Sequence, residues 1–317
     1  MGISNYLKEI GRGSAGARSL SAAQAEDLMA QVLDRSASEI EIGAFALAMR
    51  MKGETADELT GFLAATHARC QAIRSTQPVI LLPSYNGARR LPNLTPLLAL
   101  LLAQQGARVL VHGPLQDPKR IASAAILHDL GLAAARTQTE VEQAWTRNEP
   151  AFMAIDVLSP PLARLLDVRW IVGLRNSGHT VAKMLAPVVG APALRVVNHT
   201  HPEFGALLAT YARDAQASMA LLRGTEGEPV ADARRLPRID TWLHGEAQPA
   251  WSCAAQEGPL AMLPLLPREI DATTTARYIQ AVASGAQPVP GPIARQVELL
   301  LGALSALGMP AAHENAA

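Results

Sequence analysis

The segment from Val79 to Pro96 constrains the fold more than any other part of the sequence. Four apolar residues, Val79 to Leu82, are typical of a strand buried in a parallel sheet. The following Asn93-Leu94-Thr95-Pro96 predicts a helix start, with Thr95 as N-cap and Pro96 at the first helical position. A strand, a loop and a helix N-terminus can hold an anion, because free backbone N–H groups and the helix dipole converge there.

The loop between this strand and helix has an unusual composition for an anion site. It reads PSYNGARRLPN, with one glycine, Gly87, and two arginines, Arg89 and Arg90. A loop that wraps a pyrophosphate with its own backbone normally has several glycines, which let the chain approach closely. We therefore predict that this loop binds anions through cationic side chains rather than through a tight backbone cradle.

Strands and helices alternate along the rest of the chain from residue 78. After the first strand, apolar runs predict strands at Arg108–Val111, Met153–Val157, Leu194–Val197 and Met219–Leu222, and shorter ones around Trp242, Trp251 and Leu260–Leu266. Helices are predicted after Asn93, after Asp117-Pro118, and at Pro160–Leu166, Gly178–Leu185 and Pro292–Leu307. This alternation is typical of an α/β domain with a doubly wound, mostly parallel sheet.

The first 72 residues predict a small helical domain. Three capping boxes each open a helix: Ser21-x-x-Gln24, Ser38-x-x-Glu41 and Thr55-x-x-Glu58. Apolar residues at helical spacing follow each box. No residue in this domain suggests chemistry of its own, so we expect the functional residues elsewhere.

Charge is balanced overall but unevenly distributed. The chain has 28 Lys and Arg and 28 Asp and Glu, and 24 of the basic residues are arginine, whose fork suits phosphate. Residues 74–136 hold seven basic against two acidic residues, and residues 175–238 hold eight against five. Charged residues are only 18% of the chain, which suggests that some surface is buried in an oligomer.

The sequence indicates a cytoplasmic protein without a membrane span. Cys70 and Cys253 have no metal or redox spacing and are interpreted as reduced thiols. The N-terminus has no apolar core of signal-peptide length, and no apolar run approaches the roughly 20 residues of a membrane helix.

Two segments resemble the anthranilate phosphoribosyltransferase and pyrimidine nucleoside phosphorylase superfamily: AFALAMRMKGETADELTGFL (Ala44–Leu63) and HTVAKMLAPV (His179–Val188). The resemblance covers nearly the whole chain. It implies a helical domain of residues 1–72, joined by about 163–190, and an α/β domain of residues 73–162 and 191–317. It also implies a homodimer joined through the helical domain, with a cleft between the two domains.

The residues with which the family's enzymes bind phosphoribosyl pyrophosphate and magnesium are not kept. Their glycine-rich GTGGD loop falls on residues 83–87, and their K-H-G-N turn becomes Val111, His112, Gly113 and Pro114. The Asp-Glu pair that holds magnesium falls within residues 227–230, where neither acid is kept in place. Phosphoribosyl transfer needs magnesium to neutralise the pyrophosphate leaving group, so these changes argue against that reaction and against any cofactor.

Four motifs resemble one branch of the superfamily, the YbiB group: LPSYNGAR (Leu82–Arg89), RNSGHT (Arg175–Thr180), THPE (Thr200–Glu203) and LLRGTEGEPVAD (Leu221–Asp232). The resemblance implies a transferase-like fold without anthranilate phosphoribosyltransferase activity, in a homodimer that binds DNA or RNA without sequence preference.

The first group of candidate nucleic-acid and phosphate-binding residues lies in the loop after the first strand: Tyr85, Asn86, Arg89, Arg90 and Asn93. The arginines can bind backbone phosphates, with Tyr85 beside them as a stacking surface. The alternative is a solvated loop with the tyrosine packed beneath it.

The second group follows Gly173 and comprises Arg175, His179 and Lys183, with Asn176 beside them. On one helix their spacing of four residues would point all three cation-capable groups into one groove. The alternative makes His179 a hydrogen-bonded structural residue and the other two surface charges.

The third group, Arg223, Arg234, Arg235 and Arg238, surrounds a GTEGEP turn. These arginines either contact phosphate or form salt bridges with Glu226, Glu228 and Asp232. A metal site at the two glutamates, or at His199-x-His201, is disfavoured because each lacks further ligands.

The favoured hypothesis is a catalytically inactive relative of the transferases that binds nucleic acid by phosphate contacts. One alternative is a phosphoribosyltransferase or nucleoside-processing enzyme in which Asn86, Arg89, Asn93 and His179 handle another anionic substrate. Another is a scaffold whose dimer face docks a second protein.

Overall fold

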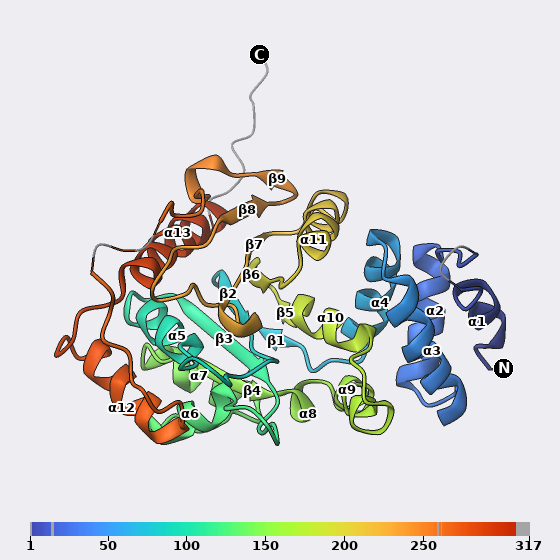
Figure 1. Cartoon of the computed structure of the whole chain (residues 1–317), viewed down its shortest axis with the longest axis horizontal. Helices are drawn as coiled ribbons and strands as arrows, with labels where there is room; N and C mark the ends of the chain where they lie inside the picture. Colours follow the sequence, from blue (N-terminus) through green and yellow to red (C-terminus); the bar gives the residue numbers. More distant parts are fainter. Residues whose placement is uncertain (1, 14–15, 259, 261, 309–317) are drawn as a thin grey trace, which may run out of the picture.

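The computed structural model describes residues 2–13, 16–258, 260 and 262–308, and it places a group of helices beside a twisted sheet (Figure 1). The first four helices lie together at one end of the molecule: α1 (Ser4–Ile10), α2 (Ala22–Leu33), α3 (Glu39–Lys52) and α4 (Ala56–His67). The three predicted capping boxes form at the starts of α2, α3 and α4, each with its reciprocal pair of hydrogen bonds. Local sequence therefore sets where these helices begin.

The main sheet has seven strands in the order β4-β3-β2-β6-β7-β8-β9. Its strands are β2 (Val79–Pro83), β3 (Arg108–Gly113), β4 (Ala151–Ala154), β6 (Ala193–Asn198), β7 (Met219–Leu222), β8 (Ile239–Leu243) and β9 (Glu246–Ala247). The first five in this order pair in parallel and the last two are antiparallel, which confirms the predicted α/β fold class. A separate parallel pair joins β1 (Ile73–Arg74) to β5 (Val188–Val189).

Helices cover both faces of the sheet, as expected for a doubly wound fold. One face carries α5 (Thr95–Gln104), α6 (Ser123–Asp129), α12 (Ala272–Ala283) and α13 (Gly291–Gly308). The other carries α7 (Gln138–Thr146), α10 (Ser177–Met184) and α11 (Pro202–Asp214). Strand β2 serves both cores, because Ile80 and Leu82 pack on the first face and Val79 and Leu81 on the second.

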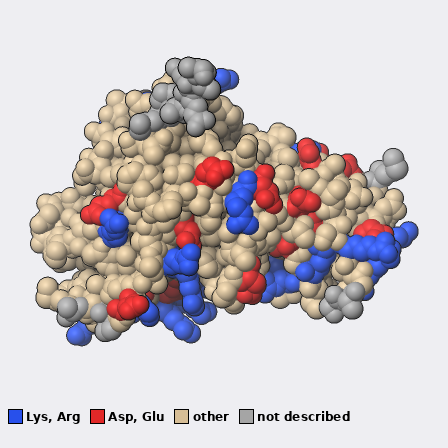
Figure 2. Space-filling model, turned by 90° about the horizontal axis from the view of Figure 1, so that it is seen from above, with Lys and Arg blue, Asp and Glu red and all other residues tan. Residues whose placement is uncertain are grey.

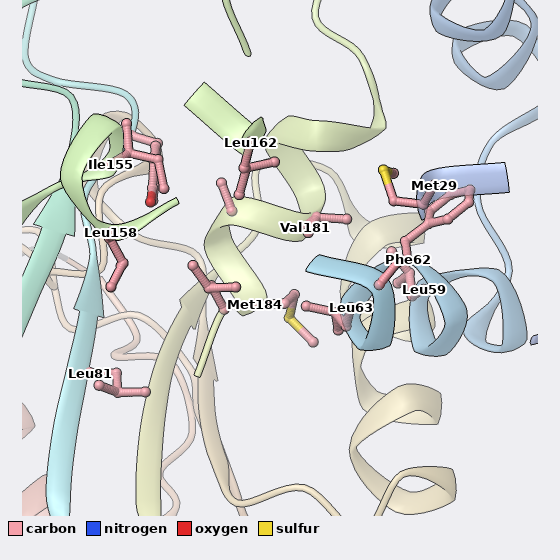
Figure 3. Packing of buried hydrophobic residues seen from close by; sticks show 14 of the residues in the cluster. Met29, Leu59, Phe62, Leu63, Leu81, Ile155, Leu158, Leu162, Val181 and Met184 are labelled. Carbon is pink, nitrogen blue, oxygen red and sulfur yellow. The ribbon is translucent and has the colours of Figure 1, made fainter. Parts of the chain in front are cut away.

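One hydrophobic core joins the N-terminal helices to the sheet (Figure 3). Two short connecting helices, α8 (Ile155–Leu158) and α9 (Pro160–Val172), lead from β4 to α10. Helix α10 lies between the two parts: its Val181 and Met184 belong to the same cluster as Phe62 of α4 and Leu81 of β2. Residues flanking α10 are therefore held rigidly at the junction of the helical part and the sheet.

Three predicted element boundaries were wrong. The strand predicted at Met153–Val157 ends at Ala154, and helix α8 begins at Ile155. Thr95 is not an N-cap: the Asn93 side chain accepts its backbone N–H at 3.1 Å, and the Thr95 hydroxyl points to Glu228. Asp117 does not cap a helix, because its carboxylate pairs with Arg169 at 3.2 Å and α6 begins only at residue 123.

The C-terminal third departs further from prediction. Trp242 lies in β8 as predicted, but Trp251 ends a 3-10 helix, η2 (Pro249–Trp251). Of the predicted strand at Leu260–Leu266, residue 261 lies outside the described residues and the others form no strand. The closing helix predicted at Pro292–Leu307 is α13. In the described part of the chain, no helix has the length and apolar character to cross a membrane.

Candidate functional site

The candidate site lies where the chain changes direction in the sheet. From β2 the chain first adds β3 and β4 on one side, and later adds β6 and β7 on the other. Ligands of open α/β sheets bind beyond the carboxyl ends of the strands at such a switch point. Two segments meet there: the loop of residues 84–91 after β2, and the end of β6 at Asn198 with the residues that follow it.

The carboxylate of Glu228 fills the space enclosed by the loop after β2. One of its oxygens, Oε1, accepts the backbone N–H groups of Asn86 at 2.7 Å and Gly87 at 2.6 Å. The other, Oε2, accepts the hydroxyl groups of Ser84 and, at 3.2 Å, Thr95. The side chain is 1% exposed. An amide-lined pocket that suits an external anion thus already holds one from the protein itself.

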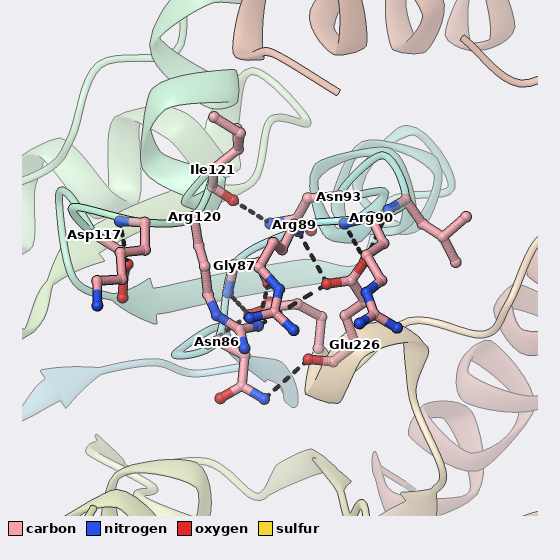
Figure 4. Close-up of polar contacts among 12 residues, drawn as sticks. Asn86, Gly87, Arg89, Arg90, Asn93, Asp117, Arg120, Ile121 and Glu226 are labelled. Atoms are coloured by element: carbon pink, nitrogen blue, oxygen red, sulfur yellow. Dashed lines mark hydrogen bonds and ion pairs between the residues drawn. The ribbon is translucent and has the colours of Figure 1, made fainter. Parts of the chain in front are cut away.

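Glu226 binds the outer half of the same loop (Figure 4). Its carboxylate accepts the backbone N–H groups of Arg89 at 2.9 Å, Arg90 at 2.6 Å and Leu91 at 2.7 Å. Its backbone carbonyl accepts the Asn86 side-chain amide at 3.0 Å. Together the two glutamate carboxylates accept hydrogen bonds from five backbone N–H groups. We call residues 224–230, which carry both glutamates, the glutamate hairpin.

Burial raises the pKa of Glu228 above its ordinary value, while the hydrogen bonds from Ser84, Gly87 and Asn86 oppose that rise. The hairpin also adopts an unfavourable backbone to present the two carboxylates. Glu226 has φ of 50° and Gly227 has φ of 81°. A left-handed glutamate is uncommon and persists only where surrounding contacts hold it.

The structure contradicts part of the role predicted for the loop. Tyr85 is only 5% exposed, and its hydroxyl is hydrogen-bonded to His112 Nδ1 at 2.8 Å, so it offers no ring face for stacking. Asn86 and Asn93 are also buried, because they hold the glutamate hairpin and the start of α5. Only the side chains of Arg89 and Arg90 are exposed to a partner.

The third predicted group divides in two. Arg234 pairs with Asp232 and Arg238 with Asp240, both at 2.8 Å, as the salt-bridge alternative expected for Asp232. Arg223 and Arg235 are exposed and form no ion pair within the described residues. A hollow of about 550 Å³ is lined by residues of both loops: Leu91, Arg223, Glu226, Arg235 and Arg238 among others. Asp232 and Asp240 line the hollow as well, whereas Arg89 and Arg90 do not. We name the four exposed arginines of the two connections, Arg89, Arg90, Arg223 and Arg235, the arginine rim.

One broad face of the molecule mixes charges of both signs. Figure 2 shows Lys and Arg interspersed with Asp and Glu on this face, among broad areas of other residues. Strong attraction of a polyanion across that face is therefore not expected. Contacts with an anionic partner would depend on local arrangements of arginines such as the rim.

The second predicted group lines a cavity of about 260 Å³ between α10, α3 and the end of β6. Arg175, His179 and Lys183 all border it, so the structure brings them together. The expected single helical face was wrong, since α10 begins at Ser177 and Arg175 precedes its N-cap, Asn176. Arg175 instead donates to the Asn86 side-chain oxygen and so links the cavity to the loop.

The three ionisable side chains of this group do not all carry a charge at neutral pH. Burial, with Arg175 nearby, lowers the pKa of His179 to about 3, so this imidazole is neutral. Its Nδ1 accepts the Asn176 backbone N–H at 3.3 Å in the capping box of α10, as the structural alternative expected. Burial lowers the pKa of Lys183 to about 8, again with Arg175 contributing. Arg175, whose pKa burial lowers to about 10, stays cationic at neutral pH.

The metal alternatives find no support in the geometry. Both glutamates direct their carboxylate oxygens at backbone N–H groups, which compete with a cation for them. The His199 Nδ1 lies 3.2 Å from the carbonyl oxygen of His201 rather than beside a second ring nitrogen. No cluster of three metal-binding side chains occurs in the described ranges.

Sequence reasoning missed two contributors to the site. Glu54, in the connection between α3 and α4, lines the cavity. The role of the glutamate hairpin as the occupant of the loop was also missed, although both of its glutamates stand out in the sequence. The spacing of two glutamates around a glycine was the available signal, but their partners lie about 140 positions away in the sequence.

Comparisons with known proteins agree with this architecture. Residues 4–70 match the model of the glycosyl transferase family, helical bundle domain. The structure is similar to that of anthranilate phosphoribosyltransferase (TrpD) from Thermus thermophilus, with a TM-score of 0.70 at 19% identity over 96% of this chain and 89% of the enzyme. It is also similar to the enzyme from Saccharomyces cerevisiae in complex with PRPP and Mg, with a TM-score of 0.64 at 12% identity over 96% of this chain and 94% of that one.

Sequence comparison gives relatives of two names. Anthranilate phosphoribosyltransferase of Pelotomaculum thermopropionicum is 28% identical over 59% of this chain, and the match spans about half (52%) of the enzyme. The uncharacterized protein YbiB of Escherichia coli (strain K12) is 35% identical over 295 residues, 92% of this chain and 90% of YbiB. The chain therefore belongs to the YbiB-like group of the anthranilate phosphoribosyltransferase-like (TrpD-like) family.

Proposed function

We propose that the protein binds nucleic acid through its phosphate backbone, without sequence preference and without catalysing phosphoribosyl transfer. The glutamate hairpin is the observation that supports this proposal. Glu228 occupies the loop amides that a pyrophosphate would need, and Glu226 ties the loop to the connection between β7 and β8, which carries Arg223 and Arg235. One structural feature thus accounts for both a blocked substrate site and an assembled set of exposed cations.

The arginine rim suits a diester backbone better than a small ligand. Its four guanidinium groups lie on two loops fastened together by Glu226, and their side chains are exposed rather than enclosed. Arginine contacts to phosphate position a strand without reading its bases. No exposed aromatic ring accompanies the rim in the loop of residues 84–91, so phosphate contacts, and not stacking, would carry the affinity.

A salt titration of oligonucleotide binding tests the proposal. A fluorescent single-stranded DNA is titrated with the protein at several salt concentrations, and log Kd is plotted against log salt. Each phosphate neutralised on a single strand contributes a slope of about 0.7. Arg89→Ala with Arg90→Ala should weaken binding of all sequences alike, and should flatten the slope by about 0.7 for each phosphate that the variant no longer neutralises.

The matched control is Arg268→Ala with Arg277→Ala. Both arginines are exposed, remote from the two loops in sequence, and without an ion pair in the described part of the chain, so this double variant removes the same charge. It should leave the slope unchanged. Equal weakening in both double variants would mean that only net charge matters, and absence of binding by the native protein would refute the proposal outright.

We also propose that two copies associate through the N-terminal helices. Ile40 of α3 and Ile171 of α9 are 86% and 87% exposed, and Ile171 borders a mostly apolar hollow beside the first turn of α3. Exposed apolar surface of this kind is typical of an interface. Sedimentation equilibrium should give twice the chain mass for the native protein, and a smaller mass for Ile171→Asp.

A further inference from the structure

The cavity beside α10 is distinct from the loop that the glutamate hairpin fills. Its volume of about 260 Å³ lies just below the roughly 300–1,000 Å³ of pockets for drug-sized ligands. It is bordered by the carboxyl end of β6, at the switch point of the sheet. Position and size therefore both suit a small ligand.

A buried amide in this cavity lacks a partner. Asn198 is 2% exposed, and its Oδ1 accepts the Lys183 ammonium at 3.1 Å. Its Nδ2 makes no hydrogen bond with any residue that the structure describes. Buried donors are almost always satisfied, and an exception calls for an absent acceptor. Asn198 is one of the residues that line the cavity, and the Lys183 ammonium lies beside its Oδ1.

Two cations line the same cavity without a direct ion pair, although the buried Glu228 lies near enough to favour the charged form of both. Neither Lys183 nor Arg175 forms an ion pair within the described residues. Glu54 is the acidic residue among those lining the cavity, and burial raises its pKa, which favours its neutral form. Arg50, His199 and His201 also border the cavity and add no negative charge. The lining therefore presents donors and positive charge.

We propose that this cavity binds the phosphate group of a phosphate monoester, with Lys183, Arg175 and the Asn198 amide as its donors. Three donor groups and two positive charges match a dianion with three free oxygens better than a carboxylate with two. Met49, Met184 and Phe204 form an apolar wall that leaves room for only a compact body attached to the phosphate.

Such a group has two sources, a small metabolite or the phosphorylated end of a nucleic-acid strand. Both present the same chemistry to Lys183 and Asn198. An internal phosphodiester differs, since it carries one negative charge and is hindered on two sides. The proposal is therefore independent of backbone binding at the arginine rim. An oligonucleotide with a 5′-hydroxyl end carries no phosphate monoester, so its affinity reports backbone binding alone.

Calorimetric titration with inorganic phosphate and methyl phosphate tests the site, with acetate as the comparison. Lys183→Met removes the ammonium with little change in shape, and Asn198→Asp places a carboxylate beside Lys183. Both should weaken binding of methyl phosphate by about tenfold or more, because each removes charge complementarity. Lys119→Met, on an exposed lysine, is the matched control and should bind as the native protein does.

Competition distinguishes the two sources. If a 5′-phosphorylated oligonucleotide displaces methyl phosphate and the 5′-hydroxyl strand does not, the strand end is the ligand. If neither displaces it, the ligand is a small molecule, and the site stands. The proposal is overturned if the native protein fails to bind phosphate or methyl phosphate at millimolar concentration, or if both cavity variants bind them as tightly as the native protein.

Discussion

At the scale of single residues, the site consists of ionisable groups whose surroundings oppose their usual charge. Burial raises the pKa of Glu228 and lowers that of Lys183, and His179 is neutral. A protein retains buried charges at a cost in stability, since their hydration is lost on folding. Ionisable groups with shifted pKa values cluster at functional sites. Of the groups named here, Lys183 is the simplest to titrate.

Lys183→Met should stabilise the protein at neutral pH. The pKa of Lys183 falls from 10.5 to about 8 on folding, so the native state disfavours the charged form by about 3 kcal/mol. That cost applies in full below pH 8 and disappears as the pH rises through 10.5, because the unfolded chain binds the extra proton only in that window. Urea denaturation of both proteins between pH 7 and pH 10.5 measures the difference.

The difference in unfolding free energy should shrink steadily across that pH range. A constant difference would show that Lys183 does not titrate there. A destabilised variant at pH 7 would show that the hydrogen bond to Asn198 outweighs the burial of the charge.

At the scale of elements, two loops from distant parts of the chain form one unit. The loop after β2 provides backbone N–H groups, and the glutamate hairpin after β7 provides the carboxylates. Gly227 permits this arrangement, since it has positive φ and packs directly against the Asn86 side-chain amide. Any side chain at this position would overlap that amide and push the hairpin from the loop.

Gly227→Ala should destabilise the protein more than Gly131→Ala. Both glycines have φ of 81°, so alanine suffers the same backbone strain of about 1 kcal/mol or more at either position. A Cβ at Gly131 meets no atom within 4 Å, whereas one at Gly227 overlaps the Asn86 amide. The excess cost in chemical denaturation therefore measures how firmly the hairpin is seated. Equal costs would mean that the hairpin moves away freely.

At the scale of the whole molecule, the fold followed from sequence and the state of the site did not. Capping boxes at Ser21, Ser38 and Thr55 and the apolar run at Val79 act within a few residues, so their pattern is legible locally. The pairing of Glu228 with Asn86 spans 142 positions, and nothing in either segment alone identifies the other. The loop was therefore expected to use its arginine side chains, while its backbone groups were already occupied.

The whole molecule thus has a transferase-like architecture in which two of its own carboxylates accept the backbone N–H groups of the loop at the switch point. Arg175, which borders the cavity, contacts Asn86 of that filled loop. We propose that phosphate groups bind at the surface and at α10, without a pyrophosphate in the loop. The competing enzyme hypothesis requires instead a loop able to admit an anionic substrate, of which phosphoribosyl pyrophosphate is the one to test first.

Thermal unfolding with and without phosphoribosyl pyrophosphate and Mg²⁺ tests that central claim most directly. A ligand at 100 times its Kd stabilises the native state by about 2.7 kcal/mol, which shifts Tm visibly. We predict no more shift than an equal concentration of methyl phosphate gives, since Glu226 and Glu228 hold the loop. A larger, magnesium-dependent rise in Tm would contradict the account and favour a transferase.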